Sequence, residues 1–326
     1  MTGVGGQATT GSPHVVALGG GTDLRSDLIG AEATALGALV QAGLRVPAAF
    51  AVTADAYRDW VGVRSTSLQE GFCESVELAY AALGRGAGRD VPVEVRSWVT
   101  GAGSRDADCS GRALARSGIS GADGVLGQIE ECWLTAFDSR AGAPAPGWPT
   151  ASDDGVAVVV QELVDARVSG VLSTGPRHGD DGSLLVIEAR YGSGEQSAAG
   201  LATPDLLEID RDTREVNRRR LGSKETECRL SADRRSVETR PVEPVRQGRW
   251  ALTEQELGLL VDLAPRVEAV FGLPVHVEWA IGDSEREQDE LFVLRMRPLP
   301  SEAPVLCGQG AAVGAVGTLL RGSGSR

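Results

Sequence analysis

Four segments rich in strand-forming residues follow one another in the second half of the chain, and they restrict the fold more than any other feature of the sequence. A turn at residues 178–182, made of glycine and aspartate after a histidine, predicts a hairpin. Strands of this kind, after a first half with helical patterns, indicate an α+β fold. The four segments cover residues 156–163, 170–174, 184–188 and 206–210.

A strong amphipathic helix is expected after these strands, at residues 253–271. Thr253 can cap its first turn, and Glu256 completes a capping box three residues later. Two more strands, at residues 275–281 and 291–296, are expected to finish the fold.

The first half of the chain combines helices with strands. Residues 31–42 place Ala33, Leu36 and Leu39 on one helical stripe, and residues 124–137 carry a second apolar stripe. Residues 54–60 predict a further helix. Strands are expected at residues 47–52 and 91–96, and Arg96 stands where the second of these ends in a loop.

The length of 326 residues, 42% of them hydrophobic, is enough for a core divided between two lobes. The proline-rich segment 144–149 is interpreted as the linker between them. We therefore expect a mobile lead at 1–13, an N-terminal lobe at 14–150, a C-terminal lobe at 151–300 and a glycine- and alanine-rich tail at 301–326.

The formal net charge of −13 predicts that the chain as a whole repels nucleic acid and anionic membranes. The first apolar run, at residues 15–18, is too short for a signal peptide, and no run approaches the length of a membrane-spanning helix. These features predict a cytoplasmic protein. Five arginines at residues 211–220 leave two interpretations open, a local basic face or a solvated surface.

Cysteine and histidine are poorly placed for disulfides or for a zinc site. The five cysteines form no CxxC pair, and the chain has three histidines. Neither number nor spacing matches a disulfide framework or a metal site built from these residues. We expect the cysteines to be reduced and mostly to serve as packing residues.

A series of short motifs, in order between Gly30 and Pro300, resembles the ATP-binding domain shared by phosphoenolpyruvate synthase, pyruvate phosphate dikinase and rifampicin phosphotransferase. Each motif is weak alone, but their order and spacing together are hard to reach by chance. The resemblance implies a two-lobed fold of ATP-grasp type. The motifs are Gly30–Gly37, Ala42–Pro47, Phe50–Thr53, Val95–Ser97, Val159–Gln161, Val168–Val171, Gly192–Glu195, Thr203–Asp205, Gly222–Lys224, Val277–Ala280 and Leu294–Pro298.

In that family, the resemblance implies, the domain binds Mg-ATP between its lobes and passes a phosphoryl group to a histidine on a separate swivelling domain. Residues 308–320 resemble the start of that swivelling domain. His276 is the last histidine of the chain, so the carrier histidine is expected on a separate partner protein.

Several residues match functional positions of the family. Arg96 and Arg297 match arginines that act on the phosphates, and Glu278 matches a carboxylate ligand of Mg2+. Arg96 could instead be a surface arginine at a strand end, and the adenine segment an ordinary central strand. The positions that match the adenine pocket and a loop over the nucleotide are Gln161, Glu162 and Leu163, and Glu195.

Three positions depart from the family pattern and put ATP and Mg2+ in doubt. Glu32 stands where the family has a phosphate-binding lysine, and Ala115 replaces a threonine. Arg295 stands where the family has a metal-binding glutamine, and arginine has no lone pair for a metal. In one interpretation Glu32 and Arg295 exchange roles, so that the arginine supplies the positive charge and the glutamate an oxygen ligand. In the other they form a salt bridge across a vestigial site.

Two functions follow from these alternatives. The first is an ATP-binding phosphotransferase subunit that phosphorylates a histidine on a separate partner. The second is a degenerate nucleotide-binding or regulatory module without turnover. Under both, we expect Arg96, Gln161, Glu278 and Arg297 to converge on one cleft between the lobes, and Glu32 to be a neighbour of Arg295.

Overall fold

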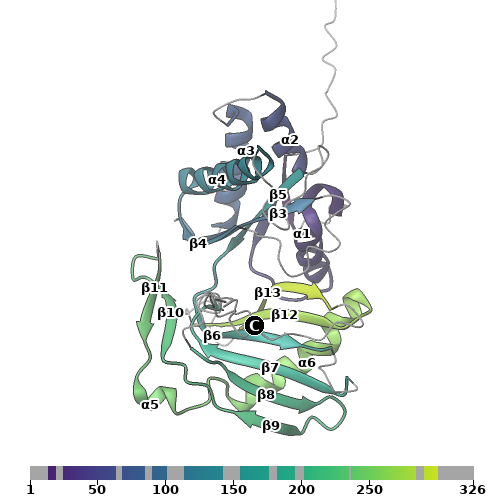
Figure 1. Cartoon of the computed structure of the whole chain (residues 1–326), viewed down its shortest axis with the longest axis vertical. Coiled ribbons are helices and arrows are strands. Elements are labelled where there is room, and N and C mark those ends of the chain that lie inside the picture. The colour runs from purple at the N-terminus through teal and green to yellow at the C-terminus, as the bar shows by residue number, and fades with distance from the viewer. Residues whose placement is uncertain are drawn as a thin grey trace, which may run out of the picture.

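The computed structural model describes residues 14–19, 25–63, 68–84, 90–100, 114–141, 155–175, 182–194, 202–234, 236–283 and 290–299. These residues form two lobes, each built on its own antiparallel sheet (Figure 1). The expected α+β class is therefore confirmed. The predicted mobile lead and glycine-rich tail, and most of the turn at 178–182, lie outside the described residues.

The first lobe is a five-stranded sheet in the order β1-β2-β5-β3-β4. Its helices pack on both faces, because the core cluster around Trp133 lies on one side and Leu36 of α1 contacts a second cluster on the other. The strands are β1 (Val15–Leu18), β2 (Ala49–Val52), β3 (Val93–Thr100), β4 (Ala115–Ile119) and β5 (Gly155–Glu162), and the helices α1 (Ser26–Gln41), α2 (Ala54–Val63), α3 (Glu70–Leu83) and α4 (Ala122–Ala141).

Strand β5 corrects the expected boundary between the lobes. A division at residue 150 assigned this strand to the C-terminal lobe, but it pairs with β2 and β3 at the centre of the first sheet. Its continuous apolar run explains this position, because Val158 and Val160 face one core cluster and Val159 faces the other. The chain enters the second sheet only after Glu162, at β6 (Ala166–Ser173).

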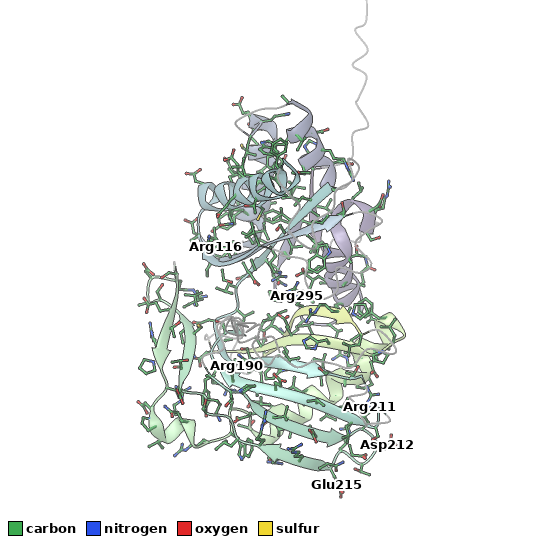
Figure 2. The ribbon with its side chains drawn as sticks, viewed as in Figure 1. Arg116, Arg190, Arg211, Asp212, Glu215 and Arg295 are labelled. Atoms are coloured by element: carbon green, nitrogen blue, oxygen red, sulfur yellow. The ribbon has the colours of Figure 1, made fainter. Side chains whose placement is uncertain are left out.

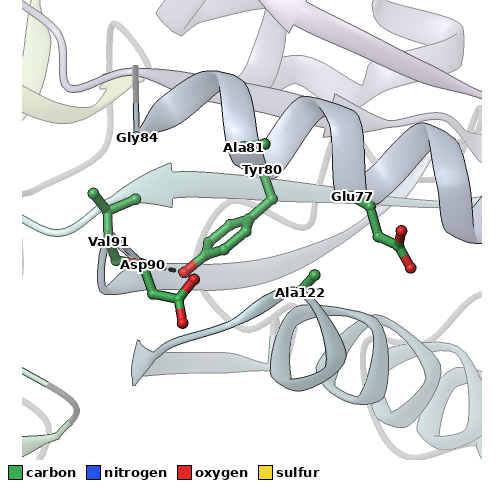
Figure 3. Close-up of a pocket in the computed structure, with 7 residues that line it drawn as sticks. All are labelled: Glu77, Tyr80, Ala81, Gly84, Asp90, Val91 and Ala122. Atoms are coloured by element: carbon green, nitrogen blue, oxygen red, sulfur yellow. Dashed lines mark hydrogen bonds between the residues drawn. The ribbon is translucent and has the colours of Figure 1, made fainter. Parts of the chain in front are cut away.

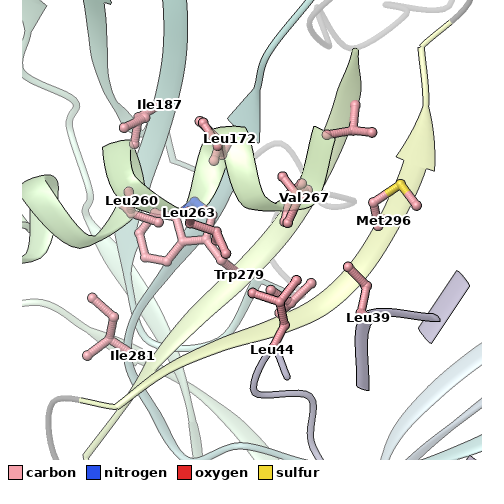
Figure 4. Close-up of a cluster of buried hydrophobic side chains, with 14 of the residues drawn as sticks. Leu39, Leu44, Leu172, Ile187, Leu260, Leu263, Val267, Trp279, Ile281 and Met296 are labelled. Carbon is pink, nitrogen blue, oxygen red and sulfur yellow. The ribbon is translucent and has the colours of Figure 1, made fainter. Parts of the chain in front are cut away.

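The second lobe is a six-stranded sheet in the order β13-β12-β6-β7-β8-β9, with α6 (Glu254–Phe271) packed on one face. Trp279, Leu172 and Ile187 meet Leu260 and Leu263 of this helix (Figure 4). The predicted capping box of Thr253 and Glu256 is present. The remaining strands are β7 (Leu184–Tyr191), β8 (Asp205–Asp210), β9 (Val216–Arg220), β12 (Val275–Gly282) and β13 (Leu291–Pro298).

A hairpin of β10 (Thr226–Leu230) and β11 (Val237–Pro241), followed by the short helix α5 (Pro244–Gln247), stands beside the second sheet (Figure 1). Its turn reaches the first lobe. Gly118 of β4 has a φ of +77°, and a Cβ there would lie 3.1 Å from the backbone nitrogen of Val237. Glycine is thus required where the hairpin meets β4.

Tyr80 ties three elements of the first lobe together. Its hydroxyl donates to the carbonyl oxygen of Val91 at 2.7 Å (Figure 3). It also accepts from the backbone amide of Gly121 at 2.8 Å. It therefore joins α3 to the segments that lead into β3 and α4. Burial is the largest influence on the Tyr80 phenol, and it raises the pKa of that group.

The arginines at residues 211–220 do not form a free basic face. Arg211, Arg214 and Arg219 each pair with an acidic residue of α6, and Arg218 pairs with Glu208 on the neighbouring strand. These pairs join β8, the following turn and β9 to the helix that covers the sheet. None of the helices in the described ranges has the length and apolar character needed to cross a bilayer.

Candidate functional site

Residues of both lobes and of the β10–β11 hairpin line a cavity of about 600 Å³, called here the interlobe cleft. Strands β3, β4 and β5 supply one wall, and β12 and β13 supply the opposite wall. Figure 2 shows Arg295 in the space between the two lobes. Six residues expected in the site line this cavity: Arg96, Gln161, Glu162, Leu163, Glu278 and Arg295.

Arg96 projects from an inner strand of the first sheet and is buried, with 3% of its side chain exposed. Its Nε lies 2.6 Å from Oε1 of Glu32, and its Nη2 donates to Oε1 of Gln161 at 3.0 Å. Its Nη1 donates to Glu94. Burial of this kind excludes the interpretation of Arg96 as a surface arginine.

The charge of Arg96 is fixed by its neighbours. Burial opposes the charged guanidinium, but the carboxylates of Glu32, Glu94 and Glu278 outweigh it and raise the pKa of Arg96 above its ordinary value. Glu94 was not among the residues expected from the sequence. The alternation of β3 contained the signal, since residues 94 and 96 of a strand share one face.

Glu32 lies near the start of α1, directly after a kink at Gly30, whose φ is +81°. Its carboxylate is as buried as Arg96, and its Oε2 lies 3.4 Å from Nη2 of Arg295. The expectation that Glu32 and Arg295 are neighbours is therefore confirmed. Neither carboxylate oxygen of Glu32 has a well-directed hydrogen bond among the described residues, so its contacts are mainly electrostatic.

Arg295 of β13 lies between two carboxylates. It pairs in register with Glu278 of β12, and its Nη1 lies 4.0 Å from Oε1 of Glu278. On its other side it contacts Glu32 and stacks over the ring of Trp98, with 5.4 Å between the guanidinium carbon and the ring centroid. Arg295 therefore links α1, β3 and β12 across the interlobe cleft.

Part of the lining of the interlobe cleft is apolar. Val164, Ala166 and Ala280 form a small buried cluster, and Leu294 packs against it. Gln161 also lines the cleft beside Arg96; it is buried, its Oε1 accepts from Arg96, and its Nε2 has no hydrogen-bond partner among the described residues. An aromatic heterocycle with a ring acceptor fits this combination of apolar walls and one donor.

The segment expected to line an adenine pocket supplies side chains rather than backbone donors. The backbone amide of Glu162 donates to the carbonyl oxygen of Ala48, and that of Leu163 donates to the carbonyl oxygen of Pro92. Both amides are used to hold β5 within the first lobe. The interpretation as an ordinary central strand and the interpretation as a pocket wall therefore both hold.

Two expected residues lie elsewhere. Arg297 follows Arg295 by two positions on β13 and shares its face of the sheet, opposite His276, but it does not line the interlobe cleft. Glu195 lies outside the described residues. Its neighbours Ser193 and Gly194 do line the interlobe cleft.

The only lysine of the sequence, Lys224, is unavailable for a phosphate. It is fully buried and paired with Asp205, and its Nζ also donates to the carbonyl oxygen of Gly222 at 3.2 Å. Asp205 in turn accepts from the backbone amides of Gly222 and Ala251, each at 2.8 Å. This pair fastens the loop before β10 to the second sheet.

The donor set at this end of the interlobe cleft does not fit a Mg2+ ion in the arrangement observed. The carboxylates of Glu32 and Glu278 each contact a guanidinium group, and Arg295 offers no lone pair. Among the described residues, no cluster of three or more metal-ligating side chains occurs.

The comparisons with known proteins agree with the motifs. The family described as "pyruvate phosphate dikinase, AMP/ATP-binding domain" matches residues 61–304. The prodigiosin synthesizing transferase PigC of Serratia marcescens is 27% identical over 304 residues, covering 89% of this chain and 33% of that protein. The rifampicin phosphotransferase of Streptomyces sviceus is 29% identical over 314 residues, covering 85% and 35%.

A probable phosphoenolpyruvate synthase of Archaeoglobus fulgidus is 29% identical over 310 residues, covering 83% of this chain and 40% of that protein. Among solved structures, the D-alanyl-alanine synthetase A of Vibrio cholerae is similar with a TM-score of 0.34 and 11% identity, covering 82% of this chain and 54% of that one. The chain thus spans between 33% and 40% of the three curated relatives named here. Because the family matches more than half of its residues, the chain belongs to the family of the pyruvate phosphate dikinase AMP/ATP-binding domain.

Proposed function

We propose that this chain is a nucleotide-binding module whose phosphate end does not support ordinary Mg-ATP phosphoryl transfer. One observation carries the proposal: both guanidinium groups at this end, those of Arg96 and Arg295, already contact carboxylates of the protein. Phosphoryl transfer depends on cations that neutralise the phosphates and on oxygen ligands that hold the metal. Here the cations and the oxygen ligands neutralise each other.

The expected penalty for a triphosphate is large. A phosphate charge placed about 4 Å from Glu32 is repelled by about 4 kcal/mol at an effective dielectric constant of about 20. That term alone corresponds to a factor of about 10³ in affinity, before the attraction of Arg96 and Arg295 for the phosphate is counted. The apolar residues that line the interlobe cleft carry no such conflict and support binding of the base.

Calorimetric titration with ATP, with and without Mg2+, tests this function together with an assay of phosphoryl transfer to a histidine-bearing swivelling domain from a relative. We expect weak binding that gains little from Mg2+, and no transfer. Glu278→Gln is expected to change the affinity little. Tight binding that requires Mg2+ and is lost in Glu278→Gln would contradict the proposal.

The position of Arg295 favours a second candidate function, phosphoryl transfer from ATP to a histidine on a separate partner. Arg295 lies 3.4 Å from Glu32 and 4.0 Å from Glu278, so a rotation of this one side chain would leave two carboxylates side by side and move a cation toward a phosphate. The multidomain length of the relatives supports a partner domain.

The two candidate functions predict opposite results for variants that carry the residues of the family at positions 32 and 295. If the site is closed, the double change Glu32→Lys with Arg295→Gln is expected to create Mg-dependent ATP binding. Glu32→Lys alone is expected to fail, because it places a lysine against Arg96 and Arg295. If Arg295 instead serves the phosphate and Glu32 the metal, the unaltered chain transfers a phosphoryl group, and the double change does not improve ATP binding.

A further inference from the structure

Glu32 contacts two arginines that line the interlobe cleft, and its own carboxylate is buried. We propose that Glu32 sets the ligand class of the interlobe cleft, so that the cleft prefers an uncharged heteroaromatic nucleoside to a nucleoside triphosphate. The inference rests on the nucleotide-binding function proposed above and makes it more specific. Its first support is geometric, because one carboxylate contacts Arg96 at 2.6 Å and Arg295 at 3.4 Å.

The backbone holds Glu32 in this position. Gly30 adopts a φ of +81°, which favours glycine, and it packs against the indole of Trp98. From this kink α1 runs between the lobes, with Ala33 and Leu36 fully buried. The backbone that carries Glu32 is therefore held in place by packing, and its carboxylate stays close to Arg96 and Arg295 in the absence of a ligand.

The charges that line the interlobe cleft offer a polyanion no net attraction. Three carboxylates, those of Glu94, Glu162 and Glu278, equal in number the three guanidinium groups of Arg96, Arg116 and Arg295. Glu32 does not line the cleft, but its carboxylate contacts two of those three guanidinium groups. Arg297 lies beside the cavity and does not line it, and the only lysine is buried with Asp205.

Apolar side chains of the cleft, together with Gln161 beside Arg96, offer contacts to an uncharged base. Val164, Ala166 and Ala280 supply apolar walls, and the buried Nε2 of Gln161 supplies a donor without a partner among the described residues. A buried donor of this kind gains from a ring nitrogen that accepts its hydrogen bond. Adenosine is therefore a suitable probe for the favoured class.

The test compares adenosine, AMP and ATP by calorimetric titration, without metal and with Mg2+, on the unaltered chain, on Glu32→Gln and on a matched control. The control is Glu254→Gln, which removes a carboxylate paired with Arg219 at 2.8 Å on the exposed start of α6, away from the interlobe cleft. Circular dichroism establishes that each variant is folded.

We expect the unaltered chain to bind adenosine at least tenfold more tightly than ATP. Glu32→Gln is expected to tighten ATP at least tenfold and to change adenosine less than threefold, while the control changes neither. The inference is overturned if the unaltered chain prefers ATP, a result that decides the matter even where Glu32→Gln does not fold. It is also overturned if folded Glu32→Gln leaves the ATP affinity unchanged.

These outcomes separate the inference from the function on which it rests. Preference for ATP refutes the ligand class and leaves nucleotide binding intact. Failure of all three ligands to bind the folded, unaltered chain refutes nucleotide binding, and the ligand class with it.

Discussion

Removal of Arg96 is expected to destabilise the protein as well as to weaken ligand binding. The change Arg96→Met leaves the buried carboxylate of Glu32 with only the 3.4 Å contact to Arg295. Breaking a buried ion pair by removing one partner costs about 3–5 kcal/mol. We expect the lower part of this range, about 3 kcal/mol, because Glu94 is 26% exposed and can be hydrated instead.

The double change Arg96→Met with Glu32→Met is expected to recover most of that loss. It replaces the pair with apolar side chains of similar size, which in buried sites is often neutral or stabilising. Arg295 keeps its contact with Glu278, and Gln161 loses one hydrogen bond worth about 1 kcal/mol. The double variant is therefore expected within about 1 kcal/mol of the unaltered chain. The coupling between the positions is then about 2 kcal/mol plus whatever Glu32→Met costs alone.

Urea unfolding followed by far-ultraviolet circular dichroism measures these differences, with tryptophan emission as a second probe for separate unfolding of the two lobes. The control is Arg240→Met on β11, whose partner Glu238 lies 2.9 Å away and is 50% exposed. Exposed pairs contribute about 1 kcal/mol or less. A double variant as unstable as the sum of its two single variants would refute the coupling on which the site description depends.

The other predictions concern single elements. Lys224→Met is expected to cost about 3–5 kcal/mol in urea unfolding, because the carboxylate of Asp205 stays buried without its partner. Thr253→Ala removes the cap of α6 and is expected to cost about 1 kcal/mol by the same measurement. Gly170→Ala is expected to abolish soluble expression, because its Cβ would lie 1.8 Å from the backbone oxygen of the neighbouring strand. Burial raises the pKa of Tyr80. The stability that the protonated phenol contributes to the fold is therefore full below the ordinary phenol pKa and is lost as the pH rises through the raised pKa. Tyr80→Phe is expected to flatten this alkaline loss of stability in thermal melts.

Local patterns predicted those elements whose burial is strongly one-sided. The helix at 253–271 was recognisable because its apolar stripe begins at a capping box, and α6 begins one residue later, at Glu254. Helix α3 was missed, although Phe72, Val76 and Tyr80 repeat at intervals of four residues and are buried. The strands β9 and β11 were missed for a physical reason, because most of their side chains are exposed and polar or charged and give no alternating pattern.

Pairing between distant segments could not be predicted from local patterns. The apolar run of β5 indicated burial on both faces, but it did not indicate that β2 and β3 would provide the neighbouring strands. The same limit applies to the site. Arg96 and Glu278 were recognisable from their motifs, whereas the contact of Glu94 with Arg96 followed from strand alternation and was overlooked.

Stability and ligand binding make opposite demands on the charges of this interlobe cleft. Arginine side chains that are free to bind a phosphate are stable only where water or the ligand screens their charge, because a buried unpaired charge is costly. In this chain Glu32 supplies a permanent partner to Arg96 and Arg295, so the two lobes are joined by ion pairs without any ligand. The pairing that stabilises the empty cleft is therefore also the pairing that a triphosphate would have to break, and one carboxylate accounts for both effects.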